Sequence, residues 1–553
     1  MKTPIRYISL AALLVLPAGL AAQTQQPDTA LVRTVVVEQE YAPLIQDAPK
    51  VNVLPRVEEP QVTPKEVEYD TAPMAAAQVP ADTLPSYAAK ETPDKAAPGY
   101  VRLGYGDLGY GGQSNLDFLA DYLFRLSARD RLGVTVGVQG MDGELETGDA
   151  EAYGYDKWDA YDYRTHAALD YTHRFDRLDL NVAGHFGLRN FNRLPDLAPG
   201  KQRFTSGDVH VGLASTDEAL PVQFRAETNL LLYQRGLDLD MEDAQEVAVR
   251  TEAEAWGSLG RGQTVGVALR MDNLLYKNNL YENYTALSLT PYYAYEANGW
   301  TLRAGVNVDP AFGFGKKFRV SPDVQAQYAF PARVVLYAQA RGGRLLNDFR
   351  RLEAVSPYAS PVGQLESTYE QVNAAVGVRV GTRSGFGLHV YGGYQNLEDD
   401  TYFGDVASSV YPALVLSTWD TDNFYVGAEL GYSYRDLVTI TARGTYRDWS
   451  AQDGGDLMGV LAFKPAFEGD FRVEAHPIKP LRVEVGYRHA GRVKVLDERA
   501  DPVSNLYAGA TYDILRWLGV YARLDNILDK DYRYDWFYPT QGINFVAGVT
   551  LRF

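Results

Sequence analysis

The last twelve residues of the chain, 542–553, constrain its fold more than any other segment. Their side chains alternate between apolar and polar types, with Val546 as the exception, and the run ends on the aromatic Phe553. Successive side chains of a β-strand point to opposite faces, so the pattern predicts a strand with one face in lipid and the other on a polar lumen. We expect Phe553 to act as an assembly signal. The apolar set comprises Ile543, Phe545, Ala547, Val549, Leu551 and Phe553.

Short turns and longer polar connections alternate from residue 99 onward, as is typical of bacterial outer-membrane barrels with tight periplasmic turns and long outer loops. The pattern predicts an all-β fold, a transmembrane antiparallel β-barrel of about 22 strands. Segment 408–420 fits either a connection or a strand. Longer connections are expected near 140–161, 342–366, 394–422, 447–457 and 526–541, and short turns at 125–132, 174–178, 215–222, 257–265, 296–301, 330–334, 381–386, 434–438, 476–481 and 514–520.

Charged residues share one side of the predicted strands. A charge on the lipid face costs roughly 2–4 kcal/mol at the bilayer midplane, so these side chains are expected to point into the lumen. Mixed signs on neighbouring strands favour salt-bridge ladders that brace the wall over a selectivity ring of one sign, and a substrate path stays open as the alternative. The lumen-lining candidates are Arg225, Glu227, Arg250, Glu252, Glu254, Arg333, Arg341, Arg482, Glu484, Arg488, Arg523 and Asp525.

Residues 1–98 lack the alternating pattern of the predicted barrel. Residues 1–22 combine a short basic start, an apolar stretch and small residues, which predicts a secretory signal peptide. Residues 23–98 are rich in proline and lack a lasting periodicity, so we expect a disordered or extended periplasmic tail. The β-branched run 31–38 is an exception, since a short strand could add to a partner or dock inside the barrel. The outer-membrane barrel then occupies 99–553.

Composition narrows the class of protein. The chain has no cysteine, which excludes disulfides, thiolate metal sites and a lipid anchor on an N-terminal cysteine. A net charge of −18 without a basic cluster argues against nucleic acid as a partner. Tyrosine (39 residues) and glycine (50) are abundant, which fits a lipid-facing barrel with aromatic girdles better than the alternative, a soluble periplasmic β-sandwich.

Histidines are the first candidates for catalysis. No nucleophile elbow, zinc-protease motif or recognisable carboxylate pair accompanies them, so we expect hydrogen-bonding wall residues and predict no catalytic residue, metal site or cofactor. The histidines on the predicted lumen side are His166, His185, His210, His389 and His476.

Two further clusters lie in the expected connections. The acidic run 397–400 and the pair Asp453 and Asp456 lack the spacing of an established calcium site, so solvated loop is the better interpretation. The aromatic residues within 153–163 and 532–538 suit either a binding role or the interfacial girdle, and both alternatives stay open.

The C-terminal region resembles a known family. Segment 520–532 contains Asn-Ile-Leu-Asp-Lys at 526–530 and is followed by Tyr-Pro-Thr-Gln-Gly at 538–542 and the terminal strand. TonB-dependent receptors typically close with an Asn-Leu-Phe-Asp-Lys-Tyr-like run, a Tyr-Pro-x-x-Gly loop and a final strand ending in Phe. The resemblance implies an outer-membrane barrel of about 22 strands and, for ordinary members, energised uptake of large or scarce nutrients.

The globular plug that family members carry ahead of the barrel has no counterpart in the expected domains of this chain. The proline-rich tail is too short to form it. An unfilled barrel of this circumference would leak, since diameter grows with strand number. We therefore expect the tail, infolded loops or another protein to fill the lumen.

The expected function is transport across the outer membrane of a Gram-negative cell, or service as the barrel component of an envelope complex. Outer-membrane lipid, the barrel-assembly machinery and a periplasmic or surface protein are the expected partners. A passive porin-like channel and an outer-membrane enzyme are the alternatives.

Overall fold

The computed structural model describes residues 98–553 except 108–112, 148–155, 195–200, 218, 236–243, 278–280, 332, 360–362, 382–384, 407–412, 436 and 453–456. The predicted signal peptide, the predicted tail and the run 31–38 lie outside the described residues, as do Asp453 and Asp456. Within the described part of the chain, neither helix reaches the length and apolarity needed to cross a membrane.

The described residues form 22 strands and two short helices. The first half of the barrel consists of β1 (Gly99–Asp107), β2 (Ser114–Arg125), β3 (Asp130–Glu146), β4 (Lys157–Arg174), β5 (Leu178–Asn192), β6 (Lys201–Ser215), β7 (Gln223–Arg235), β8 (Ala244–Gly260), β9 (Gln263–Tyr276), β10 (Tyr284–Ala297) and β11 (Trp300–Phe312).

The second half continues the same hairpin pattern and includes the helices α2 (Phe349–Val355) and α3 (Leu457–Leu461) within two of its connections. Its strands are β12 (Phe318–Phe330), β13 (Val334–Leu345), β14 (Thr368–Gly381), β15 (Phe386–Val406), β16 (Ala413–Tyr434), β17 (Val438–Ala451), β18 (Pro465–Ile478), β19 (Leu481–Arg492), β20 (Val503–Asp513), β21 (Leu518–Asp525) and β22 (Asn544–Arg552).

Each strand pairs antiparallel with the next strand along the chain. The last strand pairs back onto the first, from Tyr100↔Arg552 to Tyr105↔Ala547, and so closes the sheet. Closure leaves no free strand edge, which is how a barrel satisfies its backbone groups. The predicted closed antiparallel barrel of about 22 strands is confirmed.

The two faces of the wall differ as the alternation predicts. On β6, Val209 and Val211 leave 55% and 43% of their surface exposed on the outside. Between them His210 faces the other way, with its Nε2 atom 4.0 Å from an oxygen of Glu227 on β7. An outer band of exposed apolar side chains is stable where lipid covers it, while the polar side chains line the lumen.

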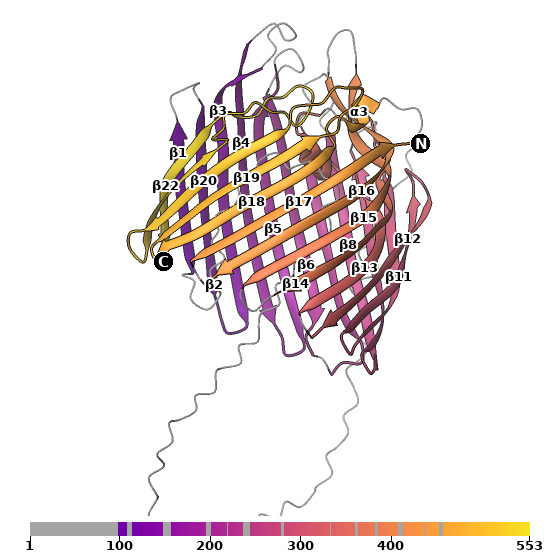
Figure 1. Ribbon diagram of the computed structural model, residues 1–553. Coiled ribbons are helices and arrows are strands. Elements are labelled where there is room, and N and C mark those ends of the chain that lie inside the picture. Colours follow the sequence, from indigo (N-terminus) through magenta and orange to yellow (C-terminus); the bar gives the residue numbers. More distant parts are fainter. Residues whose placement is uncertain are drawn as a thin grey trace, which may run out of the picture. The chain divides into compact units, whose positions relative to one another are not determined.

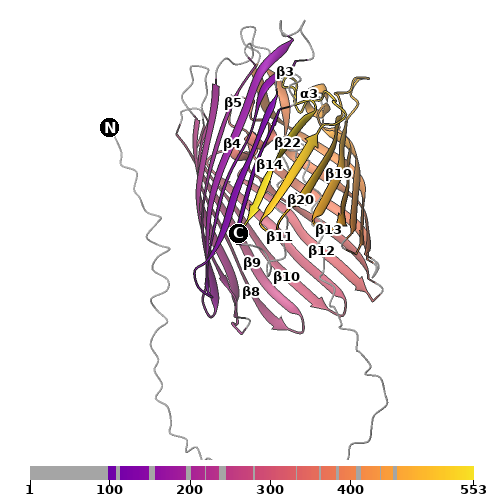
Figure 2. The ribbon, with the colours of Figure 1, turned by 90° about the vertical axis from the view of Figure 1, so that its left-hand side faces the viewer.

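The two ends of the barrel have different connections (Figures 1 and 2). Short turns gather at one end, called the turn end, and the long connections gather at the opposite loop end. The tight turns Arg261-Gly262 and Asn298-Gly299 have positive φ at both residues, between 53° and 80°. Two-residue hairpins prefer this geometry because its twist matches that of the flanking strands.

The predicted connection 394–422 is largely strand. Residues up to Val406 continue β15 and residues from Ala413 begin β16, with pairs such as Phe403↔Leu416 between them. The apolar run 413–416 supplies side chains suited to a strand. The register of the β15–β16 pairing shifts between Leu397 and Asp400, so the acidic residues 398 and 399 lie in an irregularity and the strands pair again beyond it. The open question about 408–420 is thus settled as strand from residue 413.

Tyrosines contribute to the wall as well as to its outer surface. Tyr337 lies over Gly377 on the neighbouring strand, where an added Cβ would sit 2.6 Å from the ring. Tyr507 occupies the same kind of space over Gly486, at 2.2 Å, and is only 1% exposed. Because any side chain would displace the ring, glycine is required at these crossings. Part of the tyrosine and glycine abundance is therefore explained by inner-wall packing.

Candidate functional site

Three long connections at the loop end carry apolar side chains that pack on the inner wall. They are the described residues of 346–367, 452–464 and 526–543, which together are called the loop layer. Helix α2 lies in the first connection and α3 in the second. Every cluster of buried apolar side chains found in the described residues lies at this end of the barrel.

Phe349 anchors the first connection. It is the first residue of α2 and is 2% exposed, with its ring 5.6–6.0 Å from those of Tyr233, Tyr276 and Tyr281. Asp348 caps the helix by accepting a hydrogen bond from the Arg351 backbone N–H at 2.9 Å. Burial of a phenylalanine side chain contributes about 1.5–3 kcal/mol, so this contact is a principal attachment of α2 to the wall.

Aromatic contacts join the connections to one another. Tyr358 of the first connection stacks on Tyr538 of the third, with centroids 3.7 Å apart and planes 7° apart, and Trp158 of β4 packs edge-on against Tyr538. Farther round the barrel, Phe463 of the second connection packs against Trp536 of the third, with centroids 4.7 Å apart. The loop layer is therefore one continuous apolar body and not three separate loops.

Ion pairs from the wall hold the first connection from below. Arg189 of β5 contacts Asp162 at 2.7 Å and Glu353 of α2 at 3.3 Å. Arg250 of β8 contacts Asp272 at 2.5 Å, and its other nitrogen lies 3.4 Å from Asp348. The side chains of Arg189 and Asp272 are only 10% and 4% exposed, and charges buried to that extent are stable only when they are paired. These contacts therefore help to hold α2 against the wall.

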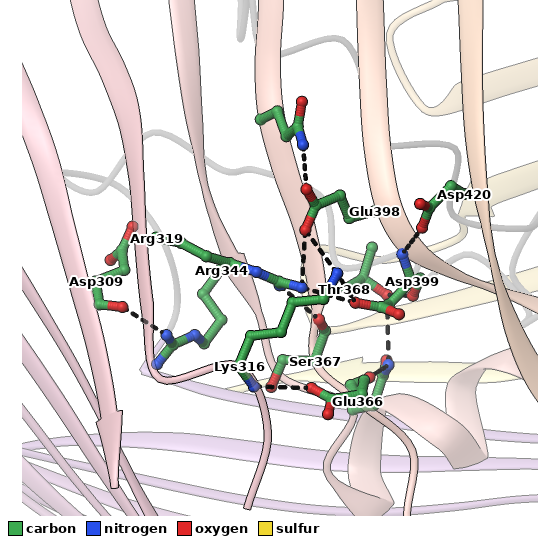
Figure 3. Close-up of polar contacts among 12 residues, drawn as sticks. Asp309, Lys316, Arg319, Arg344, Glu366, Ser367, Thr368, Glu398, Asp399 and Asp420 are labelled. Atoms are coloured by element: carbon green, nitrogen blue, oxygen red, sulfur yellow. Dashed lines mark hydrogen bonds and ion pairs between the residues drawn. The ribbon is translucent and has the colours of Figure 1, made fainter. Parts of the chain in front are cut away.

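The far end of the same connection enters the polar network of Figure 3. Arg319 reaches Glu398 and Asp399 at 2.9 and 2.7 Å, and the Lys316 ammonium lies 2.9 Å from Glu398. Thr368, which begins β14, donates a hydrogen bond to the Asp399 carbonyl at 2.8 Å. The acidic run 397–400 is therefore held by Arg319 of β12 and by Lys316 of the connection before it, and its Asp400 pairs with Lys464 of the second connection.

A cavity of about 190 Å³, lined by both polar and apolar side chains, lies against the loop layer. The cavity lies deeper in the barrel than the apolar cluster that contains Trp158. On β4, which runs away from the loop end, the lining residues Asp162 and Arg164 follow Trp158. Seven strands and two connections contribute to its lining. The lining includes the polar and tyrosine side chains of Asn115, Gln139, Asp162, Arg164, Arg189, Ser356, Tyr358, Asn505, Arg523, Asp525, Asn526, Tyr532, Tyr534, Asp535, Tyr538, Gln541 and Asn544.

Asp535 links two connections beside this cavity. Its carboxylate accepts hydrogen bonds from the backbone N–H groups of Phe537 and Tyr538, at 3.0 and 2.8 Å, and from the Ser356 hydroxyl at 3.2 Å. Burial raises the pKa of Asp535 to about 6, because removal from water disfavours the charged form more than these hydrogen bonds favour it. Burial also raises the pKa of Tyr358.

Most of the predicted lumen-lining residues lie in pairs on the wall. Of the twelve, Arg523 and Asp525 also line the cavity and Arg250 also holds α2, while the others are spread around the barrel. The shortest contacts are Arg225–Glu254 at 2.8 Å, Arg250–Asp272 at 2.5 Å, Glu252–Arg270 at 3.6 Å, Glu227–His210 at 4.0 Å, Arg341–Gln325 at 2.6 Å, Arg482–His476 at 3.1 Å, Glu484–Arg472 at 3.8 Å, Arg488–Asp470 at 3.4 Å and Arg523–Asp525 at 2.5 Å.

Arg333 and Phe553 lie outside this set of wall pairs. Arg333 occupies the turn between β12 and β13 with a φ of 60° and is exposed. The backbone of Phe553 pairs with Gly99, and its exposed ring lies 5.9 Å from that of Tyr122. The assembly role of Phe553 stays a prediction.

Two of the predicted lumen histidines, His185 and His389, contact polar side chains of nearby strands. His185 lies 2.5 Å from Asp208, and buried His389 lies between Tyr337, at 2.9 Å, and Glu429, at 3.3 Å. The described residues contain no cluster of histidines and carboxylates suited to a metal ion.

The loop aromatics have a role that neither sequence interpretation included. Trp158, Tyr532 and Tyr538 are 2–4% exposed and belong to the apolar clusters, whereas Tyr161 and Tyr163 are half-buried on β4. The residues of α2 were missed altogether within the expected connection 342–366. Phe349, Leu352 and Val355 repeat there at helical spacing, and that pattern was the available signal.

Comparison with known proteins gives matches in structure alone. No protein-family model matches the chain, and no curated protein matches it. A variant of the ferric enterobactin receptor PfeA from Pseudomonas aeruginosa is similar with a TM-score of 0.63 at 12% identity, over 82% of this chain and 81% of that one. The FrpB iron transporter from Neisseria meningitidis gives 0.63 at 10% identity, over 83% and 82%. The copper transporter OprC gives 0.58 at 12%, over 83% of each.

These neighbours are TonB-dependent receptors. The resemblance stated from the C-terminal sequence is therefore confirmed for the fold, which the barrel shares with them over most of its length. The expected absence of a plug falls on residues that the structure does not describe.

Proposed function

We propose that this chain is an outer-membrane transport barrel whose loop layer closes the lumen at the loop end until a ligand or partner displaces it. The observation that carries the proposal is the continuous apolar body inside the wall, joined by the Tyr358–Tyr538 stack and anchored by Phe349. The similar structures printed as an enterobactin receptor, an iron transporter and a copper transporter support a transport role for the fold.

The orientation follows from the connections. Tight turns face the periplasm in bacterial outer-membrane barrels and long loops face outward, so the loop layer would lie on the outer side. The predicted tail at 23–98 would then join the barrel at the periplasmic rim, because Gly99 starts β1 there and pairs with Phe553. Outer-membrane lipid would cover the exposed apolar band.

A passive pore is the less favoured function. A porin keeps a polar, water-filled passage through its lumen. Here buried rings and paired charges project into the mouth, as in the contact of Arg189 with Glu353. Water and small solutes would have to displace that layer in order to pass.

Conductance of the purified full-length protein in planar bilayers tests the proposal. We compare it with a variant in which a short Gly-Ser linker replaces 347–366, and with one that lacks 23–98. A matched control inserts the same linker after Leu496, which is 81% exposed, and leaves the loop layer intact. We expect a closed full-length protein, a closed control and at least tenfold more current after replacement of 347–366.

Other outcomes would change the assignment. Porin-like current from the full-length protein would establish the passive channel and overturn closure by the loop layer. Current that appears on removal of 23–98, with the loop layer intact, would assign closure to the tail. A barrel that stays closed in every variant would favour the envelope-complex component over a transporter.

A further inference from the structure

Six amide side chains line the cavity against the loop layer, together with three arginines and three aspartates. Amides also occur elsewhere on the described inner wall, but Asn373, Gln395 and Asn423 there are bonded to one another or to neighbouring wall side chains. The six amides of the cavity come from both sides of the barrel closure and from the third connection: Asn115, Gln139, Asn505, Asn526, Gln541 and Asn544. Amides both donate and accept hydrogen bonds without carrying charge.

The charges of the cavity balance. Its lining contains three arginines and three aspartates, and the closest partners are already engaged with each other. Arg189 and Arg164 both contact Asp162, at 2.7 and 2.8 Å, and Arg523 contacts Asp525 at 2.5 Å. A charged ligand would have to compete with these pairs, so the site selects against anions and cations alike.

Several of the amides keep hydrogen-bonding capacity. Within the described part of the chain, the Gln139 side chain takes part in no hydrogen bond. Asn115 and Gln541 share a single bond, from Nε2 of Gln541 to Oδ1 of Asn115 at 3.2 Å. The Asn115 nitrogen and the Gln541 oxygen are thus a donor and an acceptor that remain available beside the same space.

Tyrosines complete the lining on the side of the loop layer. Tyr358 and Tyr538 form a stacked pair, and Tyr532 and Tyr534 also line the space, with their ring centroids 5.8 Å apart. Tyr532 and Tyr538 are buried, whereas Tyr358 and Tyr534 are half-buried, so these two can offer an apolar face together with a hydroxyl group. The combination suits a ring that has an apolar face and a rim of hydroxyl groups.

We infer that this cavity binds one neutral sugar ring, either as a free monosaccharide or as the end unit of a longer glycan. The inference rests on the proposed transport function and names its ligand class. The volume of about 190 Å³ lies below the roughly 300–1,000 Å³ of pockets for drug-sized ligands, which fits a single ring.

The position of the cavity connects binding to closure. Ser356 and Tyr358 of the first connection line it, and so do Asp535 and Tyr538 of the third. A ligand that contacts both connections favours the loop-layer arrangement that it fits best, because binding shifts an equilibrium by its differential affinity for the two states.

Saturation-transfer NMR on the full-length protein in detergent tests the inference. The probes are D-glucose, D-galactose, D-mannose and N-acetyl-D-glucosamine, with D-glucosamine and D-glucuronate as charged counterparts and maltotriose as a glycan. We expect transfer to at least one neutral monosaccharide and at least fivefold less to its charged counterparts. In Asn115→Ala and Gln139→Leu the transfer should fall at least fivefold, as expected for loss of one hydrogen bond.

Asn181→Ala is the matched control, because Asn181 is an inner-wall amide near the turn end that bonds to Asp170 at 2.8 Å. Heat-modifiable migration on gels verifies that each variant is a folded barrel. Transfer to maltotriose through its terminal ring assigns the glycan source, and transfer to monosaccharides alone assigns the free sugar.

Three results would overturn the inference: no transfer to any neutral sugar, stronger transfer to a charged probe, or equal transfer in all variants. If sugar binding fails while replacement of 347–366 still opens the barrel, the ligand class is wrong and the proposed function stands. If sugar binds but no variant ever conducts, the barrel is a glycan-binding component and the transport function is wrong.

Discussion

The loop end and the turn end of this barrel share the same strands, but different interactions stabilise them. At the turn end, connections such as Asn298-Gly299 are two residues long and add almost nothing to the interior. At the loop end, connections of up to 22 residues turn inward and bury rings such as Phe349 and Tyr538. Strand pairing stabilises both ends, and side-chain burial stabilises the loop end in addition.

This difference separates the stability of the wall from the stability of the closure. The strands form a cooperative hydrogen-bonded cylinder, whereas the loop layer depends on aromatic contacts and a few ion pairs such as Arg189–Glu353. Parts of a protein that move in function come from its less stable regions. We therefore expect the loop layer to open while the wall stays intact.

The largest expected effect comes from Phe349→Ala. Truncation of a buried phenylalanine costs about 3–5 kcal/mol, and here the cost should fall on the loop layer. Hydrogen exchange should accelerate in 346–367 while the strands of the wall keep their protection. Phe186→Ala is the control, because Phe186 is 45% exposed on the outer face. Equal loss of protection throughout the barrel would show that wall and closure are one cooperative unit.

A charge on the outer wall should have the next largest effect. Val209→Arg places a guanidinium on the lipid face, which costs about 2–4 kcal/mol. His210→Arg places the same group one residue along, in the lumen beside Glu227, and should change stability by less than about 1 kcal/mol. Equilibrium unfolding in lipid vesicles measures both. Similar losses in the two variants would contradict the assigned faces.

The third prediction concerns pH. The pKa of Asp535, raised to about 6, lies above the ordinary value of 3.8, so proton binding favours the packed loop layer. This contribution is complete below the ordinary value and is lost as pH rises through about 6. Between pH 8 and pH 5 the layer should gain about 1 kcal/mol.

Hydrogen exchange in 526–541, corrected for intrinsic rates, measures this gain. Asp535→Asn should abolish the difference between the two pH values, while Asp531→Asn, at an exposed position of the same connection, should retain it. A difference that survives Asp535→Asn would assign the pH dependence to another group.

The smallest effect is expected in the network of Figure 3. Lys316 is half exposed and pairs with Glu398, so Lys316→Ala should cost about 0–1 kcal/mol. Arg319, 8% exposed at its side chain and paired with both Glu398 and Asp399, should cost several times more when replaced by alanine. Thermal unfolding of the loop layer, monitored by hydrogen exchange in 363–368, measures the loss of stability in each variant. Equal costs would mean that burial does not set the strength of these pairs.

The strands of the wall could be predicted from the sequence because their pattern depends on residues that are neighbours along the chain. Alternation such as that of 222–230 or 543–553 needs only the rule that neighbouring side chains face opposite ways. Short turns then give the hairpins and their number, and the C-terminal segment 520–553 indicated the family fold. The assignment of Arg225 and Glu254 to one face required nothing more, although their contact at 2.8 Å came from the structure.

Sequence reasoning was weaker wherever a residue left the strand pattern. Arg333 shares the spacing of the wall arginines, but a turn with positive φ removes it from the lumen. The apolar run at 413–416 was ambiguous because its strand depends on pairing with β15. Loop aromatics such as Trp158 were compatible with either girdle or binding site, since composition alone does not say which way a connection folds.

By itself, then, the sequence determined the strands, their two faces and the short turns, because each follows from contacts between neighbours along one strand or hairpin. The tertiary structure decided the pairing of β1 with β22, the extension of β15 and β16 into an expected connection, and the folding of the long connections into the mouth around a cavity. Its decisive contacts, Tyr358 with Tyr538 and Arg189 with Glu353, join segments more than 150 residues apart. No periodicity within either segment encodes such a meeting, which depends on the curvature of the whole barrel.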